Sequence, residues 1–179
     1  VWDGTALTKN EVTASAGEGN TDGGFVEGEG ATYTVTGSQT DVGWSNNNFT
    51  YDLKDNTKDT NYNITTKTGI LTVNPIDEEI VIKIKGQTVT ATYDGQAKTA
   101  SGYTVTVPDG IDATKITVEV AEDKTVPSVS ATDATPTALV QTITADMFTV
   151  NSPYKKVTVN CENGSLTINP RKVKMVSGS

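Results

Sequence analysis

Histidine is absent from the 179-residue chain, and cysteine occurs once. The lack of histidine removes the commonest general base and metal ligand, which excludes Ser-His-Asp and Cys-His nucleophile arrangements and the usual zinc sites. The single cysteine, Cys161, cannot form an intrachain disulfide. We interpret Cys161 as a structural residue in a strand-like run, with a reactive or intermolecular thiol as the alternative. We assign no catalytic, cofactor-binding or metal-binding residue and predict that the chain is not an enzyme.

Basic residues and apolar runs are also scarce. The chain has 14 Lys and Arg against 22 Asp and Glu, which gives a net charge of −8. Because nucleic-acid affinity depends largely on basic side chains that displace counterions from phosphates, we expect no nucleic-acid partner. No apolar run approaches the roughly 20 residues of a membrane-spanning helix, so we expect no membrane insertion in this segment.

Two polar stretches resemble ligand-binding loops only in part. Residues 17–22 are rich in glycine but miss the third glycine of a dinucleotide fingerprint and precede no helical pattern, so we predict a plain loop. Oxygen-rich loops can hold calcium, and the chain has one such loop around Asn56. Its spacing fits no calcium-loop template, so we interpret it as a solvated turn. The carboxylates concerned are Asp52, Asp55 and Asp59.

Another acidic run, Asp77-Glu78-Glu79, precedes the apolar residues 80–84. We interpret it as a charged gatekeeper that keeps an adhesive strand from pairing with other chains. Paired catalytic carboxylates are the alternative, but they need a cleft that small sandwiches rarely provide. A Lys-Asn isopeptide crosslink beside a buried carboxylate is a further hypothesis. Its candidate residues are Lys83 or Lys85 with Asn74, Asn160 or Asn169.

Threonine, by contrast, fills about one position in six. Its β-branched side chain suits a pleated sheet, and apolar and polar residues alternate with the period of two that is typical of half-buried strands. Pro108-Asp109-Gly110 and Glu162-Asn163-Gly164 supply turn residues between such runs. We therefore predict an all-β fold. The clearest alternating runs are residues 31–36, 49–53, 89–93, 103–107 and 116–120.

The chain contains an internal repeat of about 90 residues. Residues 61–75 read NYNITTKTGILTVNP, and residues 156–170 read KVTVNCENGSLTINP. Upstream, VWDGTA at residues 1–6 matches TYDGQA at residues 92–97. We predict that each closing segment is a hairpin with a glycine turn. The Asn-Pro pair ends its second strand, because proline cannot donate to the ladder.

These motifs resemble the tandem Tyr-Asp-Gly and MBG-type repeats of large bacterial surface proteins. The similarity comprises Trp2-Asp3-Gly4 and Tyr93-Asp94-Gly95, the pair Gly102-Tyr103, and the closing segments that end in Asn74-Pro75 and Asn169-Pro170. The resemblance implies an extracellular, multi-repeat stalk or adhesin region on the bacterial cell surface, with neighbouring repeats of the same protein as partners and no catalytic residues. We predict that the Tyr-Asp-Gly element is a turn with a positive φ at its glycine, and a recognition site is the alternative.

For the fold we predict two tandem β-sandwich domains of immunoglobulin-like type, at residues 1–75 and 76–170, followed by the start of a further repeat or a tail at residues 171–179. A β-grasp with one short helix is the alternative, since Thr144 could cap a helical turn. Each domain should have its own core because each has its own closing segment. We predict burial of Tyr62, Ile64, Leu71 and Val73 in the first domain and of Val157, Val159, Leu166 and Ile168 in the second.

The favoured function is a non-enzymatic spacer or adhesion module. The alternative is a carbohydrate-binding module of a secreted or cell-surface glycan-active protein, with host or dietary glycans or proteins as ligands. Such a module needs exposed aromatic side chains that stack on sugar rings, and Trp44, Tyr51 and Tyr154 are candidates. Core or hinge packing is the alternative role for Trp44, as it is for Trp2.

The two ends of the chain lead to a last hypothesis. The tail follows Asn169-Pro170 as residues 76–85 follow Asn74-Pro75, so we predict that it is the first strand of a further repeat. The first domain begins at a point where the second has already formed its strand at 80–84, and should therefore expose a sheet edge or an apolar groove. Open edges recruit strands, so the tail of one molecule could fill the gap in another and give head-to-tail self-association. The alternative is a tail that is ordered along its own second domain or frays.

Overall fold

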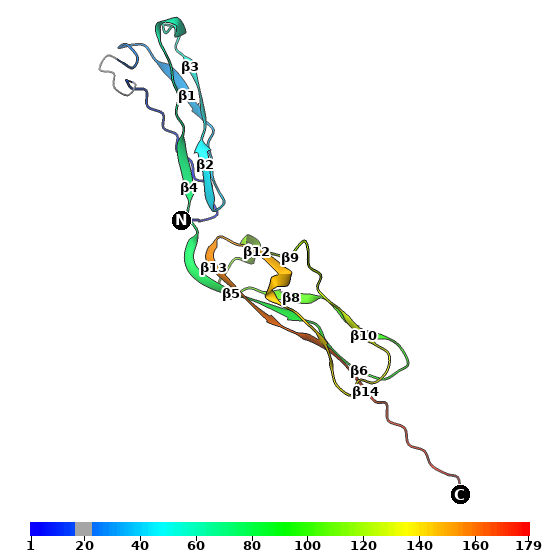
Figure 1. Cartoon of the computed structure of the whole chain (residues 1–179). Coiled ribbons are helices and arrows are strands. Elements are labelled where there is room, and N and C mark those ends of the chain that lie inside the picture. Colours follow the sequence, from blue (N-terminus) through cyan, green and yellow to red (C-terminus); the bar gives the residue numbers. More distant parts are fainter. Residues whose placement is uncertain (17–22) are drawn as a thin grey trace. The chain divides into compact units, whose positions relative to one another are not determined.

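The computed structural model describes residues 1–16 and 23–179, so the loop predicted at residues 17–22 lies outside the described residues. The all-β prediction is confirmed, since the described elements are short β-strands and three single turns of 3-10 helix. The chain divides into two compact units, Val1–Ile76 and Asp77–Ser179, whose strands are shown in Figure 1. In the part of the chain that the structure describes, no helix is long and apolar enough to cross a membrane.

The described residues of the first unit form two small antiparallel sheets. In one sheet Val35 lies opposite Phe49, and in the other Asn47 lies opposite Gly69. The amino-terminal segment joins through a bridge between Leu7 and Gln39. The pairs are β1 (Ala31–Val35) with β3 (Phe49–Leu53) and β2 (Gly43–Asn47) with β4 (Gly69–Val73), and a 3-10 turn spans Asp59–Asn61.

The core of the first unit is small. Leu71 and Val73 are buried, as predicted, because alternate residues of β4 point to one face while Ile70 points to solvent. The burial of Ile64 was predicted as well, and this prediction is wrong, since 36% of its surface is exposed. Tyr62 is half-buried and packs edge-on against Phe25.

The second unit has a central strand that begins at the boundary between the units. This strand, β5 (Ile76–Gly86), lies between β13 (Tyr154–Glu162) and β8 (Tyr103–Thr106). A second three-stranded sheet has the order β11-β14-β6, in which β14 is parallel to β6. Two further antiparallel pairs are β10 with β7 and β12 with β9. Their bounds are β6 (Thr88–Thr92), β7 (Lys98–Ala100), β9 (Thr117–Val120), β10 (Val129–Ala131), β11 (Leu139–Gln141), β12 (Phe148–Asn151) and β14 (Gly164–Asn169).

Apolar side chains of the second unit form two clusters. The larger surrounds Ile82 and Ile84 of β5, and the smaller contains Leu166 and Ile168 of β14, all four of which are fully buried. The predicted burial of Leu166 and Ile168 is therefore confirmed. The other two predicted core residues, Val157 and Val159, are half-buried and pack on the larger cluster. Both clusters consist of residues from the second unit.

The predicted closing hairpins are wrong in both units. In the first, residues 62–68 are not a strand, and β4 pairs with β2 instead. In the second, β13 and β14 follow each other directly but belong to different sheets. The reason is that β14 runs parallel to β6, so the chain leaves one sheet and enters another at Asn163. The closing segment of the second unit is thus a crossover between sheets.

The β-grasp alternative receives no support from the described residues, in which every helical element is a single 3-10 turn. At the turn Ala145–Met147, the Thr144 hydroxyl donates to the Asp146 carboxylate and makes no capping bond to the backbone. The remaining turn of this kind spans Ala113–Lys115. The several small sheets fit a β-sandwich, and the tandem immunoglobulin-like assignment stays a prediction.

Candidate functional site

The acidic residues proposed for calcium lie in an exposed segment. Asp52, Asp55 and Asp59 are all exposed, and the Asn56 side chain donates to the Gly28 carbonyl at 2.8 Å. Within residues 1–16 and 23–179, no group of three or more acidic or sulfur side chains is arranged to hold a metal ion. Asn56 therefore contributes to a structural loop contact.

The predicted gatekeeper carboxylates lie inside a strand, not before it. β5 begins at Ile76 and includes Asp77 and Glu79, which are exposed. Asp77 pairs with Lys155 at 3.3 Å and Glu79 with Lys156 at 3.4 Å. The predicted position before the strand is wrong because lysines of the neighbouring strand β13 compensate these charges, so β5 can extend through them. The gatekeeper role stays a prediction. Exposed pairs of this kind contribute little stability but favour one strand register.

The structure does not place the three aromatic candidates for sugar binding beside one another. Trp44 on β2 is 66% exposed, and Tyr51 on β3 lies directly opposite Tyr33. These strands belong to different sheets of the first unit. Tyr154 belongs to the second unit, where it is half-buried against the larger apolar cluster. Trp44 is thus the candidate whose ring is most available to a ligand.

The side chains proposed for an isopeptide crosslink are all exposed. Lys85 forms an exposed ion pair with Glu162 at 3.4 Å, and Lys83 also points to solvent. The exposed asparagine candidates are Asn74, Asn160 and Asn169. A crosslink of the expected kind forms beside a buried carboxylate, and none of these residues has such surroundings.

Cys161 is partly buried and packs against the larger apolar cluster of the second unit. Burial raises the pKa of its thiol, and the Asp146 carboxylate raises it further. A raised pKa keeps the sulfur protonated at neutral pH, whereas nucleophilic cysteines need the thiolate. These surroundings favour the structural interpretation of Cys161.

The Tyr-Asp-Gly element is a turn in both units, as predicted. The Asp94 carboxylate accepts from the Gln96 N–H at 3.0 Å, and Gly95 has a φ of +81°. At the matching place Asp3 accepts from the Thr5 N–H at 2.9 Å, and Gly4 has a φ of +80°. Hydrogen bonding from the Thr5 hydroxyl lowers the pKa of Asp3, and the Lys98 ammonium lowers the pKa of Asp94.

The same turn is attached to its unit by an equivalent backbone bond in both repeats. The Trp2 N–H donates to the Asn74 carbonyl at 2.7 Å, and the Tyr93 N–H donates to the Asn169 carbonyl at 2.8 Å. Each acceptor is the asparagine of an Asn-Pro pair. The opening and closing motifs of a repeat therefore meet in space, and they do so within one unit.

A close approach between strands in the second unit depends on a glutamine whose burial the sequence pattern did not predict. Gln141, at the end of β11, is fully buried. Its Oε1 accepts from the Gln87 N–H at 2.9 Å, and its Nε2 donates to the carbonyls of Gly102 and Pro127 at 3.0 and 2.9 Å. Gly164 lies opposite Gln141 in the register. Gln141 therefore ties the segments at Gly102 and Pro127 to the β5–β6 bend.

The first unit contains an open groove of about 1460 Å³. Its lining includes Val12 of the amino-terminal segment, Phe49 of β3, Leu71 of β4, and Tyr62 and Ile64, which precede β4. The first domain was expected to expose a sheet edge or an apolar groove, and it exposes a groove of mixed lining. Both apolar and polar side chains line it, and this groove is the candidate binding site of the chain.

The two units suggest a matched pair of glycine substitutions. A β-carbon at Gly164 would lie 2.5 Å from the Gln87 carbonyl oxygen, whereas a β-carbon at Gly69, the repeat counterpart, would meet nothing within 4 Å. We expect Gly164→Ala to destabilise the second unit by about 1–3 kcal/mol through overpacking. Gly69→Ala should leave the first unit unchanged or slightly more stable. Urea unfolding followed by peptide-resolved hydrogen exchange measures both, and equal effects at the two sites would contradict the described crossing.

Comparisons with known proteins give no relative. No protein-family model, no curated protein and no solved structure matches the chain. Function must therefore be argued from the residues and their arrangement.

Proposed function

We propose that the chain is a non-enzymatic repeat module of a bacterial cell-surface protein, in which tandem β-sandwich units of immunoglobulin-like type serve as a stalk or spacer. The observation that carries this proposal is the recurrence in both units of one motif, the Asp-Gly turn bonded to the closing Asn-Pro pair. The bonds from Trp2 to Asn74 and from Tyr93 to Asn169 occupy the same place in each. Repeated units that each hold their own ends together can be joined in series, which is what a spacer requires.

The chemistry of the chain agrees with this role. Histidine is absent, and the single thiol is kept protonated by its surroundings. The resemblance to Tyr-Asp-Gly and MBG-type repeats supports an extracellular location and an adhesin-like parent protein. Neighbouring repeats of that protein are the partners that this role implies.

A display experiment tests the spacer role directly. The chain is inserted between a cell-surface anchor and a reporter binding domain, and capture of a bulky ligand is measured. We expect more capture than with a direct fusion, because the module lifts the reporter away from the cell wall. A flexible Gly-Ser linker of equal residue number is the control, and capture no better than the direct fusion would contradict the proposal.

Carbohydrate binding is the second candidate function, and one observation favours it. The Trp44 side chain on β2 is 66% exposed, and exposed indole rings stack well on sugars. For a spacer, we expect no retention in affinity electrophoresis with mucin or plant polysaccharides and no reproducible signal on a glycan array. Binding that is lost in Trp44→Ala but kept in Tyr93→Ala, an exposed aromatic outside the first unit, would replace the spacer by a carbohydrate-binding module.

A further inference from the structure

We propose that the groove of the first unit is an acceptor for a β-strand, and that residues 171–179 of a second copy of this chain occupy it. This inference concerns self-association, and it does not depend on the spacer role. It begins with a difference between the two units. The sheet β13-β5-β8 of the second unit has no counterpart among the described residues of the first.

The two segments that would lie on either side of such a strand are nevertheless present in the first unit. The repeat places residues 61–66 at the position of residues 156–161 in β13, and residues 12–15 at the position of β8. Neither segment is a strand in the first unit, and both line the groove. A strand needs a ladder partner, and in the second unit β5 is that partner for both flanks. The groove therefore lies where the first unit would hold a counterpart of β5.

Gly69 gives an independent sign of the vacant strand position. Its repeat counterpart Gly164 must be glycine because the backbone of Gln87 passes within 2.5 Å of where a β-carbon would be. At Gly69 the same space is open. The first unit thus has a residue suited to a close strand crossing, but the crossing strand is missing from the described residues.

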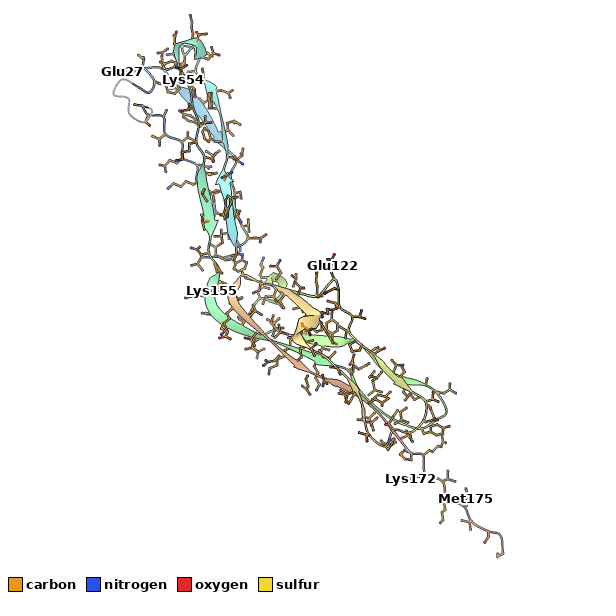
Figure 2. All side chains as sticks on the ribbon, viewed as in Figure 1. Glu27, Lys54, Glu122, Lys155, Lys172 and Met175 are labelled. Atoms are coloured by element: carbon orange, nitrogen blue, oxygen red, sulfur yellow. The ribbon has the colours of Figure 1, made fainter. Side chains whose placement is uncertain are left out.

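The tail has the sequence position of β5 and is available in the structure. It follows Asn169-Pro170 directly, as Ile76 follows Asn74-Pro75. It forms no strand, and Val173, Met175 and Val176 are 73%, 90% and 78% exposed. Figure 2 shows Lys172 and Met175 on this extended segment. In a strand, Val173 and Met175 would share one face, which gives the tail an apolar side to place in the groove.

The lysines of β13 disfavour the second unit as the acceptor of the tail. The tail places Lys172 and Lys174 where β5 has Asp77 and Glu79, which face two lysines of β13. On the second unit these tail lysines would meet like charges. In the first unit the lysine positions are taken by Thr60 and Asn61, and the unit as a whole has ten acidic and four basic residues. At these two positions the tail lysines therefore meet no like charge in the first unit, whereas β13 would repel them in the second.

The nine tail residues correspond to residues 76–84, so they cover the wall formed by residues 61–66. The counterpart of Gln87 is not among them. Strand addition along one wall gives a weak, concentration-dependent contact. Because donor and acceptor are different surfaces of the same chain, the contact builds open chains of molecules, not closed dimers.

Sedimentation equilibrium over a wide range of concentrations tests the proposal. We expect the average mass of the intact chain to rise with concentration and that of a chain ending at Pro170 to stay at the monomer value. Hydrogen exchange should show that residues 61–67 gain protection in the intact chain as concentration increases. Strictly monomeric behaviour of the intact chain, equal association of the truncated chain, or protection that does not depend on concentration would each overturn the proposal.

A pair of substitutions locates the contact. Ile64→Lys places a positive charge in the groove wall at a residue that is already partly exposed, so we expect the fold to persist and the association to be lost. Val42→Lys is the matched control, because Val42 is equally exposed in the same unit but does not line the groove. Association that survives Ile64→Lys, or that is lost equally in Val42→Lys, contradicts the groove as acceptor. Circular dichroism verifies that both variants are folded.

Discussion

Replacing Leu166 by alanine is expected to lower the free energy of unfolding of the second unit by about 2–5 kcal/mol. Leu166 is fully buried in the smaller cluster of that unit, where it packs with Ile168 and Ala100. Removal of three carbon atoms leaves a cavity that short, tightly paired strands cannot easily fill. The first unit should keep its stability, because its buried residues are its own.

The measurement separates the units by their fluorescence. Both tryptophans, Trp2 and Trp44, lie in the first unit, so their emission reports on its unfolding while circular dichroism reports on both. Val140→Ala is the control, since Val140 lies on β11, which pairs with the strand of Leu166, but is 54% exposed. We expect this control to stay within about 0.5 kcal/mol of the natural chain. A shift of the tryptophan transition in Leu166→Ala would mean that the units unfold together.

Gln141→Leu is expected to destabilise the second unit by at least about 3 kcal/mol. The substitution keeps the approximate volume but orphans the Gln87 N–H and the carbonyls of Gly102 and Pro127, at roughly 1–3 kcal/mol for each buried group. Urea unfolding followed by circular dichroism measures the loss. The exposed Gln96 provides the control, and Gln96→Leu should have almost no effect.

Gln141→Glu adds a test of the bond directions. A carboxylate keeps the acceptor for Gln87 but faces two carbonyl oxygens, so folding should raise its pKa. A raised pKa in the folded state means that stability is present at low pH and is lost as the pH increases through that pKa. We therefore expect this variant to be more stable in mild acid than at neutral pH. The opposite trend would show that Gln141 does not donate to these carbonyls.

The sequence predicted the all-β class and the Tyr-Asp-Gly turns, because alternation and turn chemistry are local properties. It failed at residues 61–66, whose alternation is as clear as that of β13. Pattern alone does not make a strand, since the backbone also needs a ladder partner, and in the second unit β5 is that partner. The hairpin prediction failed for a related reason. A glycine between two strands indicates a turn, but the chain can use it to pass closely beside another strand.

The crossing at Gln141 could not be predicted from the sequence. A single glutamine is usually at the surface, and β10 and β11 have three residues each, too few for a recognisable alternation. The available signal was the paired small residues, Gly86 and Gly164, which approach each other closely in space. The groove, in contrast, was foreseeable from the repeat, because one unit had a strand that the other lacked.

The parallel pairing of β14 with β6 has a mechanical consequence. Five consecutive residue pairs, from Ser165 opposite Thr88 to Asn169 opposite Thr92, join these strands. Tension that enters the second unit through β5 and leaves it at Asn169 pulls the two strands in opposite directions along their length. All the bonds of the ladder are then loaded together in shear, and they cannot be opened one after another as in a zipper. The unit is thereby built to resist stretching along the chain.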